Sequence, residues 1–285
     1  MQITSQTFKA NTVKALADVE LQRALRHVEK GFIGKRQKAA DALPEFDALR
    51  DNAVEIKNHT LKHLDLYIEA YVAKVEASGG RVHFAEDADH ARRIFLDIAK
   101  RRKAKTVTKG KTMISEEIGL NAFLEENGIL PVETDLGEYI IQLRGEHPSH
   151  IIAPAVHINR DQVEADFRKF HVHLDPKRDL VRPETLLSEA RQILRQKYGE
   201  ADIGVTGANF LIAETGTSVI VTNEGNGDLT QLMGKCHVVL ASLEKLVPTL
   251  EETAQILRVL ARSATGQEMS VYTTLSTGPK RTEDE

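Results

Sequence analysis

The sequence predicts an α/β fold, in which a parallel or mixed sheet is flanked by helices and preceded by an N-terminal helical arm. Apolar residues recur at helical spacing through the first quarter of the chain. From Arg81 onward, short apolar segments alternate with longer amphipathic ones, a pattern typical of sheets covered by helices. With 285 residues, the chain can form one large domain or two smaller ones.

The helical arm is predicted from two amphipathic stretches. Residues 11–30 place apolar side chains at helical spacing, and Gly31 supplies a stop. A longer stretch begins near Pro44, which suits a first helical turn, and continues to Gly79 and Gly80. The expected division of the chain is a helical arm over residues 1–78, an α/β domain over residues 79–276 and a polar linker or tail over residues 277–285.

Turn residues between apolar segments define the elements expected in the α/β domain. Asp87 is suited to cap the helix that follows it. Strands are expected over residues 81–84, 106–108, 129–133, 203–205, 210–213, 218–221, 237–240 and 271–275. Helices are expected over residues 88–98, 114–124, 160–170, 183–198 and 250–262, while 139–143 and 151–155 are short apolar segments.

Composition and charge exclude several classes of protein. Hydrophobic residues make up 41% and charged residues 28% of the chain, which indicates a folded globular protein. The net charge of −4 argues against nucleic acid as a partner, and the basic run at residues 100–105 suits the end of a helix. Without a signal peptide or a run of ~18 apolar residues, we expect no transmembrane segment and a cytoplasmic location.

The residues give little support for a metal site. The single cysteine, Cys236, excludes an internal disulfide and a four-cysteine cluster, and its apolar strand is typical of a core position. The histidines do not follow a familiar zinc spacing, so we expect no metal in this chain. Those considered are His147, His150, His157, His171 and His173.

Small and hydrogen-bonding residues gather at three strand ends, in residues 204–209, 213–217 and 222–226. Because ligands of α/β sheets bind at strand ends, these residues are candidates for the rim of a pocket. Tight turns would need the same residue types, and the sequence leaves both interpretations open. Glu214 is a candidate nucleophile, base or hydrogen-bond acceptor among them.

A second candidate is the Lys109-Gly110-Lys111 segment between a predicted strand and a helix start. Backbone N–H groups and the helix dipole favour an anion at such a place. The segment lacks the spacing of a phosphate-binding loop or a dinucleotide fingerprint, and a solvated loop is the alternative.

Four segments, in their order and separation, resemble the lactate-utilisation (LUD) domain family. The resemblance covers nearly the whole chain and is to the N-terminal part of the iron–sulfur subunit of bacterial L-lactate oxidation systems. The segments are KGKTMISEEIGLN (109–121), ETDLGEYIIQ (133–142), HPSHIIAPAVH (147–157) and AETGT (213–217).

The resemblance implies a fold similar to the sugar-phosphate isomerase and coenzyme A transferase-like superfamily. It also implies a part in oxidising L-lactate to pyruvate, with electrons passed through [4Fe-4S] clusters and with the other subunits of the complex as partners. In the family those clusters belong to a ferredoxin-like C-terminal region. With Cys236 alone, this chain is expected to hold no cluster and to be inactive by itself.

The resemblance further implies a small anionic ligand at strand ends, since superfamily relatives bind phosphorylated or coenzyme A substrates there. The resulting ligand site comprises Lys109, Lys111, Gly207, Asn209, Thr217 and Asn223, with Glu214 as the catalytic candidate. Two alternatives remain open. One is an isomerase or acyl/coenzyme A transferase-like enzyme that acts alone through Glu214, and the other is a non-catalytic scaffold that associates through residues 11–78, for example as a homo-oligomer.

Overall fold

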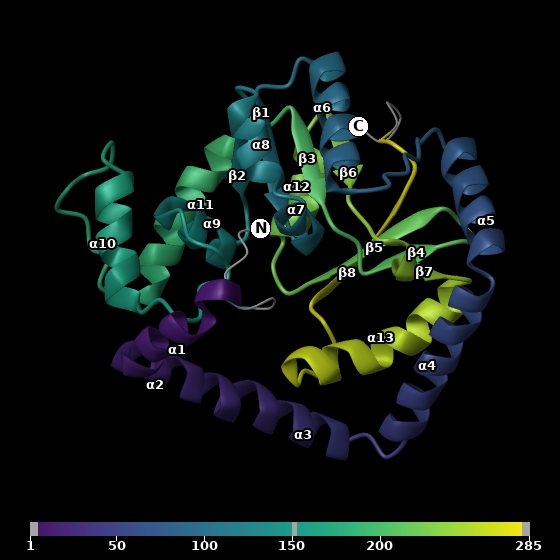
Figure 1. Ribbon diagram of the computed structural model, residues 1–285, viewed down its shortest axis with the longest axis horizontal. Coiled ribbons are helices and arrows are strands. Elements are labelled where there is room, and N and C mark those ends of the chain that lie inside the picture. Colours follow the sequence, from purple (N-terminus) through teal and green to yellow (C-terminus); the bar gives the residue numbers. More distant parts are fainter. Residues whose placement is uncertain (1–4, 150–152, 281–285) are drawn as a thin grey trace.

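A computed structural model describes residues 5–149 and 153–280, and two four-stranded sheets lie at its centre (Figure 1). Sheet A has the order β2-β1-β3-β6 and is parallel throughout. Sheet B has the order β7-β4-β5-β8, with β5 antiparallel to both of its neighbours. The α/β class with parallel and mixed sheets is therefore confirmed. The strands are β1 (Thr106–Gly110), β2 (Leu130–Glu133), β3 (Ile203–Thr206), β4 (Phe210–Ile212), β5 (Thr217–Thr222), β6 (Cys236–Val239), β7 (Leu246–Val247) and β8 (Tyr272–Thr277).

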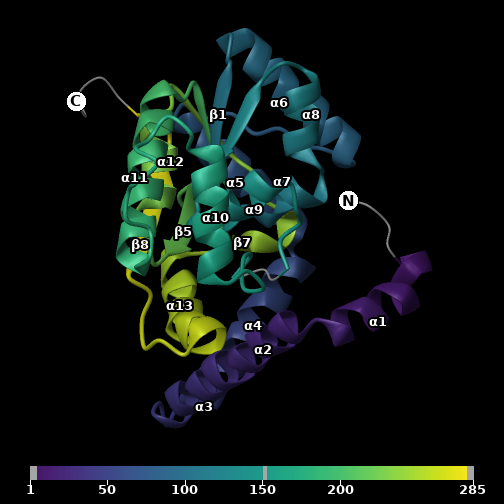
Figure 2. The same cartoon turned by 90° about the vertical axis from the view of Figure 1, so that its left-hand side faces the viewer.

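Helices cover both faces of sheet A (Figure 2). On one face, α6 (Ala88–Arg102) and α8 (Leu120–Glu126) bury Phe95 and Leu124 against Val107 and Ile203 of the strands. The other face carries α11 (Pro183–Glu200) and α12 (Asn226–Met233). Shorter helices complete this half of the molecule, namely α7 (Met113–Glu117), α9 (Leu136–Arg144) and α10 (Arg160–Phe170).

Sheet B is also packed on two faces. The helix α13 (Leu250–Thr265) places Ile256 and Leu260 against a cluster that contains Phe210 and Val219. On the other side, Tyr67 and Ile68 of α5 (Leu64–Ala77) pack on a cluster formed by β4 and β7, and the short η3 (Leu243–Lys245) directly precedes β7. The arm therefore contributes to the core of sheet B, and the domain boundaries at residues 78 and 276 stay predictions.

The N-terminal arm is helical, as predicted, but broken into more pieces. Its first stretch is interrupted at Asp18, and its second at His63, where the helix is divided in two. Figure 2 shows α1 projecting away from the rest of the molecule. The arm's elements besides α5 are η1 (Ser5–Thr7), α1 (Phe8–Ala17), α2 (Val19–Val28), η2 (Glu29–Ile33), α3 (Gly34–Asp41) and α4 (Phe46–Lys62).

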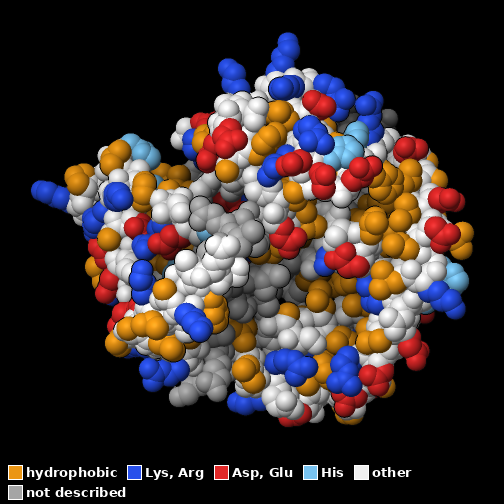
Figure 3. All heavy atoms as spheres, viewed as in Figure 1, with side chains coloured by type: hydrophobic (Ala, Val, Ile, Leu, Met, Phe, Trp, Pro, Cys, Tyr) orange, Lys and Arg blue, Asp and Glu red, His pale blue; other side chains and the backbone are white. Residues whose placement is uncertain are grey.

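Asp87 caps α6 as predicted, because its side chain accepts a hydrogen bond from the backbone N–H of His90 (2.7 Å). The basic run ends the same helix, and Lys103 adopts the left-handed conformation at its C-cap, with φ of 52°. Figure 3 shows Lys and Arg side chains gathered at the top of the molecule, over α6. The basic residues thus lie at the negative end of a helix dipole, which confirms their interpretation as a helix end.

One predicted strand is wrong. Residues 81–84 belong to no helix or strand, and Phe84 at their end is 53% exposed. Alternating side chains favour an extended backbone, but a strand also needs a partner with free backbone groups, which periodicity does not report. The apolar segment at 139–143 lies within α9, where Tyr139 and Ile140 are buried.

The helix α12 approaches sheet A more closely than a side chain on the strand would allow. A Cβ at Gly204 of β3 would overlap the carbonyl oxygen of Thr230, which lies on α12. Gly234, just after α12, also lies against the backbone of β3. The absence of side chains at these glycines thus sets the distance between helix and sheet.

We expect Gly204→Ala to lower the free energy of unfolding by about 1–3 kcal/mol, because α12 has to move away from β3. Urea unfolding followed by circular dichroism measures the loss. Gly199→Ala in α11 is the matched control, since a Cβ there meets no atom within 4 Å; it is expected to stabilise the helix by about 0.5–1 kcal/mol. Equal effects of the two substitutions would show that the close approach does not matter.

Candidate functional site

A groove runs along the carboxyl ends of the strands of sheet A and continues beside sheet B. The ends of β1, β2 and β3 contribute Lys111, Asp135 and Gly207 to its lining, and the β5–α12 turn contributes Asn223 and Glu224. Its volume of about 2380 Å³ exceeds the few hundred Å³ that a small ligand needs. A small molecule would therefore occupy only one part of it.

Beneath this groove, Lys109 forms a buried ionic cluster. Its side chain is 1% exposed, and its Nζ lies 2.7 Å from Glu133 Oε1 and 2.5 Å from Glu116 Oε1. Nζ also donates to Ser115 Oγ at 2.6 Å, and the amide of Asn121 donates to Glu133 at 2.7 Å. Burial disfavours the ammonium ion, but the two carboxylates outweigh it and raise the pKa of Lys109, which stays charged.

Lys111 lies two residues further on, at the surface of the groove. It adopts the left-handed backbone conformation, with φ of 58°. Its carbonyl oxygen accepts a hydrogen bond from the N–H of Gly207 at 3.2 Å. A side chain at position 207 would not fit, because its Cβ would lie 2.5 Å from that oxygen. Its Nζ pairs with Asp135 and lies 3.0 Å from Glu224 Oε2. Burial lowers the pKa of Lys111, but the two carboxylates outweigh burial and raise this pKa above its ordinary value.

Glu138, in the first turn of α9, is the carboxyl group of the groove lining whose pKa departs most from its ordinary value. Its Oε2 is shielded from solvent and has no hydrogen-bond partner among the described residues. Burial, reinforced by the charges of Glu133 and Asp135, raises its pKa to about 8. At neutral pH this side chain is therefore a carboxylic acid that can donate a hydrogen bond.

His237 on β6 is a neutral histidine of the same lining. Its Nε2 lies 2.8 Å from the hydroxyl of Thr206, and burial lowers its pKa to about 4. It therefore adds hydrogen-bonding capacity but no charge at neutral pH.

The structure brings four of the predicted site residues to this groove: Lys111, Gly207, Asn209 and Asn223. Asn209 accepts a hydrogen bond from the Val221 N–H at 2.8 Å, so it also joins β4 to β5. Asn223 donates to Gln267 at 3.0 Å. Their ligand-binding role stays a prediction.

Three predicted residues lie elsewhere. Lys109 is not in a loop, because β1 runs to Gly110, and its charge is already paired. Thr217 is buried, and its hydroxyl bonds to Thr215 and Thr277. Glu214 is exposed beyond the opposite end of β4 from Asn209, where its Oε2 accepts from the Leu250 N–H at the start of α13 (3.2 Å). Glu214 therefore has a contact typical of a helix start, away from the groove.

The amino-acid sequence that forms this groove matches a known protein family. Its profile, described as the LUD domain, aligns with residues 68–285. The chain belongs to the LUD domain family. No solved structure matches it, so the likeness to the sugar-phosphate isomerase and coenzyme A transferase-like superfamily stays a prediction.

Relatives of this LUD domain carry names that refer to lactate or to electron transport. It is 39% identical over 281 residues to "Lactate utilization protein B" of Bacillus licheniformis, and 38% identical over 281 residues to the protein of that name in Bacillus subtilis. It is 38% identical over 278 residues to "Uncharacterized electron transport protein YkgF" of Escherichia coli K12. These alignments cover 97–98% of this chain but 58% of each relative.

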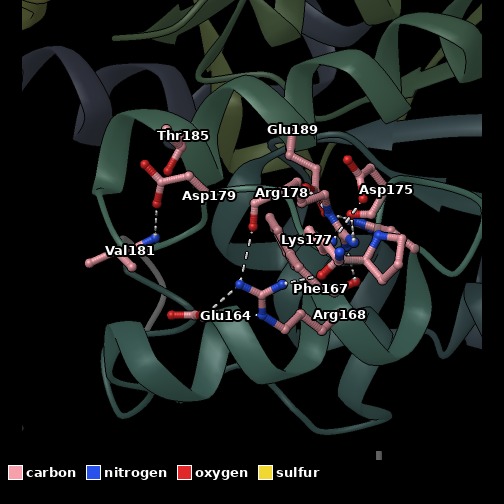
Figure 4. A network of polar contacts seen from close by, with 12 residues as sticks. Glu164, Phe167, Arg168, Asp175, Lys177, Arg178, Asp179, Val181, Thr185 and Glu189 are labelled. Atoms are coloured by element: carbon pink, nitrogen blue, oxygen red, sulfur yellow. Dashed lines mark hydrogen bonds and ion pairs between the residues drawn. The ribbon is translucent and has the colours of Figure 1, made fainter.

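The histidines of this LUD domain make structural contacts. His171 is buried, with its ring nitrogens 2.8 Å from the Tyr139 hydroxyl and 2.7 Å from Glu189. Figure 4 shows Arg178 paired with the same Glu189, and Arg168 reaching from α10 to the carbonyl of Arg178. Arg168 also donates to the carbonyl of Pro176 at 3.0 Å. His157 contacts Ser149 and Glu146. Among the described residues, His147 and His173 have no side-chain hydrogen bond, and His150 lies outside the described residues. Over residues 5–149 and 153–280, no three His, Cys, Asp or Glu side chains are placed to hold a metal.

The sequence interpretation did not single out three of the acidic residues that line the groove, Asp135, Glu138 and Glu224, although Glu224 lies within the candidate rim segment 222–226. Asp135 accepts from the Gly137 N–H at 3.0 Å and so caps α9 directly after β2. A rule that searches every strand end, including residues 133–138, would have found it together with Glu138.

None of the helices in the described ranges is long and apolar enough to cross a bilayer.

We expect Lys109→Met to lower the free energy of unfolding of this LUD domain by about 3–5 kcal/mol, because Glu133 is left buried without its cation. Urea unfolding at pH 7 measures the change. Lys105→Met is the control, since that lysine is exposed, and a change within about 0.5 kcal/mol is expected there. A Lys109 variant as stable as the Lys105 variant would contradict the importance of the buried cluster.

Proposed function

We propose that this chain is the LUD-domain portion of an iron–sulfur electron-transfer protein that takes part in the oxidation of L-lactate to pyruvate. The observation that carries the proposal is the 38–39% identity over nearly the whole chain to proteins named for lactate utilisation. The name of the Escherichia coli relative, which refers to electron transport, supports the redox part.

The [4Fe-4S] clusters of this proposal do not fit the present chain. Such a cluster is held by four cysteine thiolates, and the chain has Cys236 alone, which begins β6 of sheet A and packs against the core. The chain spans 58% of the curated relatives it matches. We therefore assign the clusters to the part of those relatives that this chain does not span, and no step of the chemistry to Cys236.

In this proposal the LUD domain binds a ligand in its groove and contacts the other subunits of a lactate-oxidising complex in the cytoplasm. The groove supports this role because it lies at the carboxyl ends of parallel strands, where α/β proteins bind their ligands. A solitary isomerase or acyltransferase acting through Glu214 is not favoured, because Glu214 is exposed and bonds to the start of α13.

A chimera tests the proposal. This chain replaces the matching 58% of "Lactate utilization protein B" in a Bacillus subtilis strain that lacks its own copy, and growth on L-lactate is measured. We expect the chimera to restore growth, whereas this chain alone does not. A chimera that is expressed, brown from its clusters and unable to support growth would overturn the proposal. Growth supported by this chain alone would overturn the need for clusters.

A further inference from the structure

One side chain of the groove has a hydrogen-bonding group that the protein itself does not use. Glu138 Oε2 is shielded from solvent and has no partner among the described residues. A buried polar atom without a partner costs about 1–3 kcal/mol. Glu138 lines the groove and its side chain is only partly buried, so a ligand bound there can approach the carboxyl group and supply a partner.

The charges around Glu138 decide what kind of partner it accepts. Glu133 of β2 and Asp135 before α9 disfavour a second negative charge, while Lys109 and Lys111 at the end of β1 favour it. Burial and the carboxylates prevail, so the pKa of about 8 leaves Glu138 protonated at neutral pH. Two further carboxylates of the cluster, Glu116 on α7 and Glu224, pair with Lys109 and Lys111. A protonated Glu138 donates, and its partner is an acceptor oxygen.

Lys111 shows where the charge of such a ligand would lie. Its Nζ is held on one side by Asp135, which is 18% exposed, and on the other by Glu224, which is 61% exposed. Asp135 is fixed, since it caps α9 and accepts from the Asn226 amide at 3.4 Å. Glu224 lies in an exposed turn, and a surface ion pair of this kind contributes at most about 1 kcal/mol. Its carboxylate occupies the position that a ligand carboxylate would take on Lys111.

The start of α12 adds a second positive element beside Lys111. No side chain caps this helix at Gly225, and the N–H of Gly227 bonds to the side chain of its neighbour Asn226. A Cβ built at Gly227 would lie 4.0 Å from Cγ of Lys111, so the positive end of the helix dipole is close to that lysine. An anion between Lys111 and α12 is therefore favoured by both.

We propose that Lys111, the unpartnered carboxyl group of Glu138 and the start of α12 bind the carboxylate end of a small 2-hydroxy or 2-oxo monocarboxylic acid, which displaces the side chain of Glu224. This inference rests on the proposed function and specifies the ligand class of its groove. A single negative charge suits the site, because Lys111 is one cation and Asp135 remains beside it. A phosphate dianion or a dicarboxylate would add a second charge near Asp135.

Isothermal titration calorimetry of the full chain with pyruvate and with L-lactate tests the site. At pH 7, we expect Lys111→Met to weaken binding about 10- to 100-fold, because a charged hydrogen bond is lost. Glu224→Gln is expected to tighten binding about two- to fivefold, because a competing carboxylate is removed. A gain in affinity discriminates best between the possibilities, because a damaged fold would weaken binding. Glu224 is exposed, so we expect its substitution to leave the fold intact.

The pH dependence isolates Glu138. Its protonated fraction falls about tenfold between pH 7 and pH 9, so the affinity of the unaltered protein should fall by about that factor. Glu138→Gln keeps a donor without a titrating proton and should bind with nearly constant affinity across this range. Loss of binding at every pH in Glu138→Gln, with an unchanged melting curve, would overturn the role of its proton.

Further controls keep the test specific. Glu55→Gln removes an exposed charge on α4, outside the groove, and should leave binding unchanged. Equal tightening by Glu55→Gln and Glu224→Gln would reduce the effect to net charge and overturn the site. Binding of inorganic phosphate as strong as that of pyruvate would overturn the ligand class, and no binding of either acid up to about 20 mM would overturn the inference. A chimera that grows on L-lactate while the isolated chain binds neither acid would refute this site and leave the proposed function standing.

Discussion

The buried pairing of Lys109 with Glu133 and Glu116 is the interaction on which the geometry of the groove depends. A lysine that is 1% exposed is tolerated only if anions and hydrogen-bond acceptors surround it. Its partners come from the end of β2 and from α7, so three segments are held at one point. Lys111 follows Lys109 by two residues, and Asp135 follows Glu133 by two. The cluster therefore fixes the two surface residues that face each other across the end of the sheet.

A second constraint acts from the opposite side of sheet A. The hydroxyl of Thr230 on α12 lies 3.0 Å from that of Thr134, which in turn donates to the Lys109 carbonyl at 2.9 Å. Together with the close approach at Gly204, these bonds hold the start of α12 beside Asp135. The chain also passes from sheet A to sheet B at residues 207–209, directly beneath Lys111. The groove thus lies where both sheets, α9 and α12 meet, and this explains why its lining comes from distant parts of the sequence.

The sequence was a good guide to elements and a poorer one to side-chain partners. Segments such as 203–205 and 218–221 were located because compact apolar runs between turn residues are a local signal. The environment of Lys109 was mistaken because β1 extends two residues beyond its apolar run, and its partner Glu133 is distant in sequence. Glu214 was grouped with Asn209 because both flank one apolar strand. They are at opposite ends of β4, roughly 15 Å apart at the rise of an extended chain, and periodicity does not say which end faces the groove.

The packing of the arm bears on the scaffold alternative. Residues of α5 belong to the core of sheet B, and Arg262 of α13 donates to the Ala39 carbonyl of α3 at 2.9 Å. An association surface spread over residues 11–78 would have to expose side chains that already hold sheet B in place. Exposed apolar side chains occur along the whole arm, from Val13 and Leu16, each more than 60% exposed, to Leu66 on α5, which is 59% exposed. The helix α1 has no buried residue and projects from the rest of the molecule (Figure 2), so a surface for other subunits that leaves the core of sheet B intact would include α1.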